Sequence, residues 1–169
     1  MRQETPELFY QLGATLLSAN PMFALLLGSP ESQARAVLKG LSFAFGPPQV
    51  GALGPGAVPS LAEVLWESIP ARLQRRLREL CDAPGALDYD AAVRMARSAV
   101  RRAGMFACGH LGVALNETCA EEGIPESALS SASRVSALAA QHASIRSLLS
   151  LATSPEYAQI RWWLGRGAR

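Results

Sequence analysis

Apolar residues recur at three- and four-residue spacing along most of the chain, which is the period of one face of an α-helix. The longest stretch of this kind runs between Asp88 and Gly123 and contains no proline. Asp88 suits a helix N-cap because its carboxylate can accept an amide hydrogen of the first turn. The predicted buried stripe is rich in alanine and comprises Val93, Ala96, Val100, Ala103, Ala107, Leu111 and Ala114. Small residues let backbones approach closely, so we expect a central helix enclosed by others, with a kink near residues 109–112.

Three further helices begin at a capping residue followed by proline and glutamate. These starts lie at Thr5, Ser29 and Ser154, and predict helices over residues 5–19, 30–45 and 154–165. Their predicted inner faces are Leu8, Leu12, Leu16 and Ala19 in the first, Ala34, Val37, Leu41 and Phe45 in the second, and Tyr157, Ile160 and Leu164 in the third. The apolar run over residues 22–27 is too short to decide between a helical turn, a buried strand and an extended connector.

Residues 46–59 are rich in proline and glycine and predict a loop, although the same composition suits a boundary between two parts of the chain. Ser60 and Glu63 form a capping box that starts a helix running to about residue 68. Pro70 opens the next helix, with Leu73, Leu77, Leu80 and Cys81 expected to face inward. A later helix is predicted through Val135, Leu138, His142, Ile145 and Leu149. These patterns predict an all-α protein in which residues 1–169 form a single compact domain of seven or eight helices, the first of them packed on the central helix.

The composition narrows the classes of function. Charged residues make up 18% of the chain and hydrophobic residues 49%, a thin charged surface that favours a partner covering part of it. The net charge of +2 is too small for a dedicated nucleic-acid binder. All basic residues except Lys39 are arginine, which suits bidentate pairing with carboxylates and equally fits the codon bias of a GC-rich genome. The chain shows neither a signal peptide nor an apolar run close to 18 residues, so we expect a cytoplasmic protein.

Cys108 and His110 suggest a thiol- or metal-dependent activity, because an imidazole can lower a thiol pKa and both groups bind zinc. On a helix these two side chains would point about 200° apart, so a buried structural cysteine beside an ordinary histidine is the simpler interpretation. His142 lies in a predicted apolar stripe, which favours a core or edge histidine over a catalytic base. The odd number of cysteines, without CxxC spacing, fits a reducing compartment. No common catalytic or cofactor-binding motif occurs, and we expect neither a catalytic residue nor a metal or cofactor site.

Trp162 and Trp163 are adjacent in the last predicted helix, so both cannot enter the same core. A large aromatic side chain that is partly exposed is typical of a binding hot spot. Arg94, Arg97 and Arg101 mark the expected solvated flank of the central helix and could face acidic groups of a partner. These five side chains are the candidate interaction surface.

The segments VRRAGMFACGHLGVAL and LLSLATSPEYAQIRWWLG resemble the C-terminal helical region of myxobacterial tetratricopeptide-repeat proteins of unknown function. That region in turn is similar to a degenerate gluzincin metallopeptidase scaffold. The resemblance places Ala14, Thr15, Ser18, Arg97 and Arg101 where a peptidase of that type has its metal ligands and catalytic residues. None of these five can replace the residues concerned, so the resemblance implies a scaffold without the zinc. In those proteins repeats precede this region, whereas residues 1–169 contain none, which leaves open whether the sequence is a fragment of a longer protein, a paralogue or a separate protein.

The resulting hypothesis is a non-enzymatic helical module for protein interaction or regulation. Its partner would be another protein or a second copy of the chain, with neither nucleic acid nor membrane involved. The alternative is the thiol- or metal-dependent activity at Cys108 and His110.

Overall fold

The structure, a computed structural model, describes residues 5–47, 57–82 and 88–167. In these ranges the regular elements are ten α-helices and one 3₁₀ helix, without a strand, which confirms the all-α class. The prediction of seven or eight helices is wrong. The additional helices arise where an apolar run was undecided and where two predicted helices are each broken in two.

Three short features account for the larger number of helices. Residues of the undecided run form α2 (Pro21–Gly28). The stretch predicted as the central helix divides into α6 (Tyr89–Cys108) and α7 (Leu111–Glu121) at Gly109, whose φ is +69°, a backbone conformation that ends a helix and favours glycine. The helix predicted through His142 divides there into α8 (Ala132–Gln141) and α9 (Ala143–Ala152).

The other helices begin close to their predicted starts. They are α1 (Pro6–Ser18), α3 (Glu31–Phe45), α4 (Ala57–Ser68), α5 (Ala71–Cys81) and α10 (Pro155–Gly167), with the 3₁₀ helix at Glu126–Leu129. Asp88 caps α6 as predicted, since its Oδ1 accepts the Ala91 amide at 3.1 Å. Helix α4 begins before Ser60, so the loop prediction is wrong for residues 57–59. Proline is tolerated in the first turn of a helix, where its missing N–H has no partner to lose. Residues 48–56 of that loop lie outside the described residues.

The chain folds into two compact units, residues 24–95 and residues 1–23 with 96–169. Each unit has buried apolar side chains of its own. The single domain stays a prediction.

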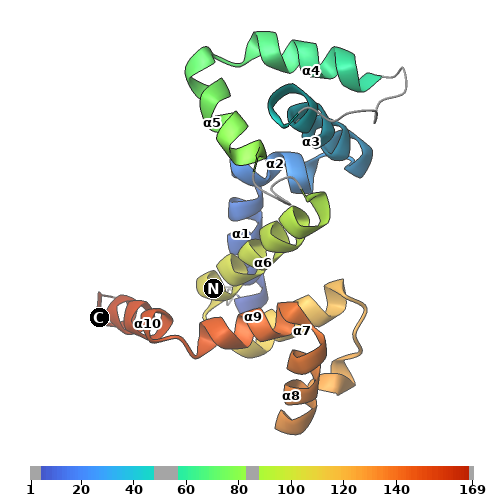
Figure 1. The fold of residues 1–169 in the computed structure, drawn as a ribbon. Coiled ribbons are helices and arrows are strands. Elements are labelled where there is room, and N and C mark those ends of the chain that lie inside the picture. The colour runs from blue at the N-terminus through green and yellow to red at the C-terminus, as the bar shows by residue number, and fades with distance from the viewer. Residues whose placement is uncertain (1–4, 48–56, 83–87, 168–169) are drawn as a thin grey trace. The chain divides into compact units, whose positions relative to one another are not determined.

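In the unit of residues 24–95, α3 and α4 lie side by side (Figure 1). Ala34 and Phe45 of α3 are buried as predicted, and the Phe45 ring stacks on Trp66 of α4 with centroids 5.4 Å apart. Helix α5 is held by Gln74, whose side-chain amide donates to two carbonyls at the end of α4. No residue of α5 is buried. The predicted inward face is therefore wrong at Leu73 and Leu80, which are 46% and 56% exposed.

In the other unit the core lies where α7 and α9 meet the second half of α6. Its fully buried side chains include Tyr10, Met105, Cys119, Ile145 and Leu148. Ser98 of α6 and Ser147 of α9 share a hydrogen bond of 2.9 Å. The close approach of α1 to α6, which was expected between the first and the central helix, depends on glycine.

Glycine permits this approach because a Cβ on Gly13 would overlap Ala107, and one on Gly104 would overlap the Tyr10 ring. Helix α1 therefore packs through Tyr10 and Gly13. The leucines predicted to face inward lie on the opposite side of the helix, so that prediction is wrong. Leu8, Leu12 and Leu16 are 58%, 51% and 67% exposed.

Among the described helices, none alone has both the length and the apolar composition to cross a bilayer. The bent pair α1 and α2 satisfies those two criteria only when both helices are taken together.

Candidate functional site

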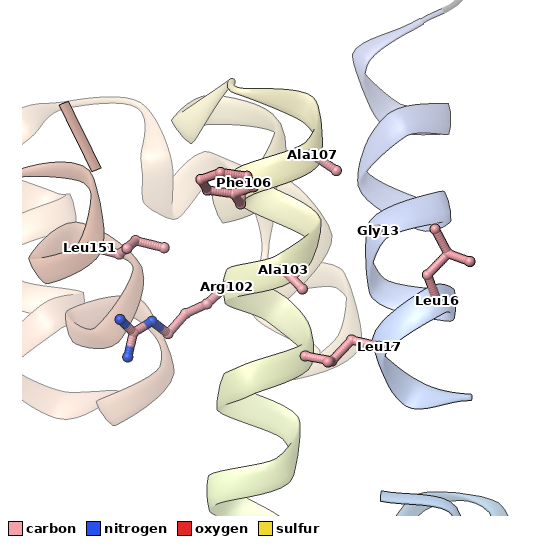
Figure 2. Close-up of a pocket in the computed structure, with 8 residues that line it drawn as sticks. All are labelled: Gly13, Leu16, Leu17, Arg102, Ala103, Phe106, Ala107 and Leu151. Atoms are coloured by element: carbon pink, nitrogen blue, oxygen red, sulfur yellow. The ribbon is translucent and has the colours of Figure 1, made fainter. Parts of the chain in front are cut away.

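An open groove of about 600 Å³ runs along α6 between α1 and α9 (Figure 2). Its floor is formed by Ala103 and Ala107, whose small side chains point toward α1. Leu17 of α1, Phe106 of α6 and Leu151 of α9 supply the larger apolar side chains. Arg102 is the one charged residue of the lining. The groove can bury apolar groups, and it holds no arrangement of acid, base and nucleophile.

The outward face of α1 continues the apolar surface beside this groove. Leu16 belongs to the groove lining, and Leu8 and Leu12 follow it along the same side of the helix. Residues four apart lie on one face of a helix, so the three leucines form a stripe. We call these residues the α1 stripe.

Helix α10 is anchored to the end of α6. The Phe106 and Tyr157 rings meet edge to face with centroids 6.1 Å apart. The Arg161 guanidinium donates to the Phe106 carbonyl at 3.5 Å and lies where a Cβ on Gly109 would be. A cation beside the last carbonyls of a helix is favoured by the helix dipole. This contact fixes the direction in which the following residues point.

Trp162 and Trp163 follow Arg161 directly and are 67% and 74% exposed. The sequence predicted that at least one of them would lie at the surface. Ile160, which was predicted on the inner face, is 45% exposed, so that prediction is wrong. The contacts that hold α10 to α6 are made by Tyr157 and Arg161 instead. Leu164, the third predicted inner residue, has a side chain that lies outside the description.

The arginine flank of α6 divides into two kinds of residue. Arg94 and Arg97 are exposed, as expected. Arg101 is buried, so its assignment to a solvated flank is wrong. Its Nε lies 2.8 Å from Glu121 and its Nη1 lies 2.6 Å from Glu122. Arg101 is thus a structural ion-pair residue that holds the end of α7 against α6.

Glu122 joins this ion pair to the break between α8 and α9. Its Oε2 accepts a hydrogen bond from Ser144 at 3.0 Å and lies 3.3 Å from Nδ1 of His142. Burial by itself would raise the pKa of Glu122, but the hydrogen bonds from Ser144, Arg101 and His142 outweigh it and lower the pKa. His142 is therefore a partnered edge histidine, in line with the interpretation from the sequence.

This cluster of Arg101, Glu121 and Glu122 was missed from the sequence. A signal for it exists, because Arg101 precedes Met105 and Cys108 by four and seven residues and so lies on their buried face. The acidic partners, twenty residues further on, carry no corresponding signal.

Cys108 is buried, and the hydrogen-bond contacts of its sulfur are to backbone atoms, namely the Met105 and His110 carbonyls and the His110 amide. Burial raises the pKa of Cys108. His110 is exposed and forms the N-cap of α7. A nucleophilic or metal-binding cysteine needs a lowered pKa. Cys108 therefore contacts the backbone of His110 and not its imidazole. The alternative hypothesis of a thiol- or metal-dependent activity gains no support from this geometry.

A metal site would need several ligands together. Across residues 5–47, 57–82 and 88–167, no group of three or more His, Cys, Asp or Glu side chains is placed to hold a metal ion. The three cysteines are free. The hydroxyls of Tyr10 and Thr118 are enclosed without a hydrogen bond of good geometry, and burial raises the pKa of Tyr10 to about 12. A phenol of that kind is a poor proton donor at neutral pH.

Comparison with known proteins gives no match: no family model, no curated protein and no solved structure is similar to this chain. The tetratricopeptide-repeat and gluzincin-like resemblance is therefore untested.

Proposed function

We propose that the protein is a non-enzymatic helical module that binds another protein or a second copy of itself through Trp162 and Trp163 of α10. The observation that carries this proposal is the exposure of Trp162 and Trp163 on a helix whose other side is fixed by Arg161. Exposed tryptophan is costly in water and is enriched at the centres of protein interfaces, where it contributes most of the binding energy. Two such rings on a helix provide a contact with less loss of conformational entropy on binding than the same rings on an unstructured segment.

Other apolar surfaces of the same unit support the proposal. The groove along α6 and the α1 stripe leave further apolar side chains in contact with water. Exposed apolar surface of this extent favours an interaction role. The chemistry of the partner surface would be apolar, with acidic groups able to meet the exposed Arg97.

Several wider expectations belong to the same proposal. We retain the resemblance to the helical region of tetratricopeptide-repeat proteins, the role of α6 as the organising helix, and a location in the cytoplasm. A protein partner is favoured over nucleic acid because the net charge is only +2.

The experiment compares the wild-type protein with a Trp162→Ala, Trp163→Ala variant, each purified from the cells that express it and analysed by native mass spectrometry. The wild type should carry a second polypeptide, or a second copy of itself, in stoichiometric amount. Loss of two hot-spot residues should weaken that complex by about 30-fold or more. An equally abundant complex in the variant would contradict the proposal. Circular dichroism establishes that the variant keeps its helices.

A further inference from the structure

A second surface lies in the unit of residues 24–95, which does not include the tryptophan pair. A pocket of about 250 Å³ opens between the end of α3 and the middle of α4. Its apolar wall is formed by Phe43 and Trp66, which are 44% and 39% exposed. Its other lining residues are Ala44, Ala62, Glu63 and Glu67. We call this the acidic aromatic pocket.

The two glutamates of the pocket are not neutralised by any residue that the structure describes. Glu63 and Glu67 are one helical turn apart on α4, both are exposed, and neither has an ion-pair or hydrogen-bond partner among the described residues. Like charges at this spacing repel one another and destabilise a helix slightly. A cationic group placed between them would remove that repulsion.

Helix α5 of the same unit presents the complementary chemistry. Leu73, Leu77 and Leu80 occupy positions i, i+4 and i+7, the spacing by which a helix anchors in an apolar groove. Arg72 and Arg76 flank this leucine stripe, and both are exposed without an ion-pair partner among the described residues.

The charges of the two surfaces have the same spacing. Arg72 and Arg76 are four residues apart on α5, as Glu63 and Glu67 are on α4, and side chains at this spacing lie about 5–6 Å apart at Cβ. Two helices laid side by side can therefore form two ion pairs at once. Within one chain Arg78 already lies over the Trp66 ring, 4.9 Å from its centroid, which shows that this aromatic surface accepts a guanidinium.

We propose that the chain forms a homodimer in which α5 of each copy docks on the acidic aromatic pocket of the other. The leucine stripe would enter against Phe43 and Trp66, while Arg72 and Arg76 pair with Glu63 and Glu67. The exchange is reciprocal, so a two-fold axis closes the assembly and uses both surfaces of both copies. This contact is separate from the α10 contact of the proposed function, and either can fail without the other.

The test is a charge exchange measured by sedimentation equilibrium of the purified full-length protein. One variant carries Arg72→Glu and Arg76→Glu, and the other carries Glu63→Arg and Glu67→Arg. Each alone should dimerise at least tenfold more weakly than the wild type, because like charges then meet in both contacts. A mixture of the two variants should recover dimers. In a mixed dimer one contact pairs native arginines with native glutamates, and the other pairs the introduced glutamates with the introduced arginines. Native mass spectrometry identifies these as mixed dimers.

The matched control is Arg75→Glu, which lies about 200° around α5 from Leu73 and should leave the dimer unchanged. A wild-type monomer, a dimer that persists in both double variants, or a mixture without mixed dimers would each overturn the inference. Recovery in the mixture also shows that both variants are folded. If the wild type is monomeric while the complex that depends on Trp162 and Trp163 is retained, this inference fails and the proposed function stands.

Discussion

The guanidinium of Arg101 lies 2.6 Å from the carboxylate of Glu122, and Arg101 is only 8% exposed. This ion pair connects α6 to the end of α7. Replacing Arg101 with leucine should lower the free energy of unfolding by about 2 kcal/mol, the usual contribution of hydrogen bonds to charged groups. Urea denaturation measures the change. The control is Arg97→Leu on the same helix, where the side chain is exposed and the effect should stay within about 0.5 kcal/mol. Equal effects of the two substitutions would contradict the structural role of Arg101.

Glu122 should make stability depend on pH. Because its pKa is lowered in the folded state, the ionised carboxylate contributes stability above its unfolded pKa of about 4.5, and this contribution is lost as the pH falls through the folded value. The wild type should therefore exceed Glu122→Gln in stability near pH 6. The difference should be smaller at about pH 3.5, which lies below the unfolded pKa, because the unfolded chain then binds a proton at this position more readily than the folded chain does. Urea denaturation at the two pH values measures it, and a difference that does not change with pH would show that the carboxylate charge is not involved.

Gly13 should be intolerant of a side chain. A Cβ there would overlap the Ala107 Cβ and the Ala103 carbonyl, so Gly13→Ala should separate α1 from α6 at a cost of about 1–3 kcal/mol. Gly112 in α7 has open space around it, and alanine there should be neutral or stabilise by up to about 1 kcal/mol. Thermal unfolding of the two variants compares them. Similar melting temperatures would mean that α1 does not approach α6 as closely as described.

Alanine substitutions at Gly109 and Gly123 can be compared to separate the effect of losing the Arg161 contact from the effect of backbone strain. Both have a φ near +70°, at +69° and +68°, where alanine costs about 1–2 kcal/mol. A Cβ on Gly109 would also overlap the Arg161 guanidinium, whereas one on Gly123 meets open space. Gly109→Ala should therefore displace the Arg161 guanidinium and weaken the contact of α10 with α6, whereas Gly123→Ala should leave that contact intact. Hydrogen exchange of the α10 amides reports that weakening, and unchanged protection in Gly109→Ala would count against the anchoring role of Arg161.

Much of the helix order follows from local signals in the sequence. Proline at the first helical position marks α1 and α10, and Asp88 caps α6, because these effects depend only on neighbouring backbone groups. The break at Gly109 was anticipated as a kink, whereas the one at His142 was not, since an apolar stripe continues through it.

The direction in which helices face was predicted less well. Helix α1 carries leucines on one side and Tyr10 with Gly13 on the other, and hydrophobicity alone selects the leucines. In the structure the opposite side of α1 packs against α6, because Gly13 lets the two helix backbones approach and the Tyr10 ring fills the space over Gly104. The prediction that the leucines of α5 face inward was wrong for a related reason. Helix α5 contacts the neighbouring residues through Gln74 and Arg78. Apolar faces that remain exposed are those a partner can cover.

The candidate interaction residues were only in part recognisable from the sequence. Adjacent tryptophans cannot both be buried by one helix face, so the exposure of at least one of them followed from geometry, and the structure leaves both exposed. Arg101 could not be distinguished from Arg97 by residue type. Its spacing from Met105 and Cys108 was the available signal for burial, whereas its acidic partners are brought close only by the fold.

Photo-crosslinking in the expressing cells can show whether Trp162 and Trp163 of α10 form a protein-binding surface. A benzophenone amino acid replaces Trp163 in one version of the protein and Ala140, an exposed residue of α8, in another. If the tryptophan pair binds a partner, position 163 should give one dominant crosslinked species, identified by mass spectrometry as another protein or as a second copy, and position 140 should give none of comparable yield. Equal or absent crosslinking at both positions would mean that this end of the helix is not a binding surface.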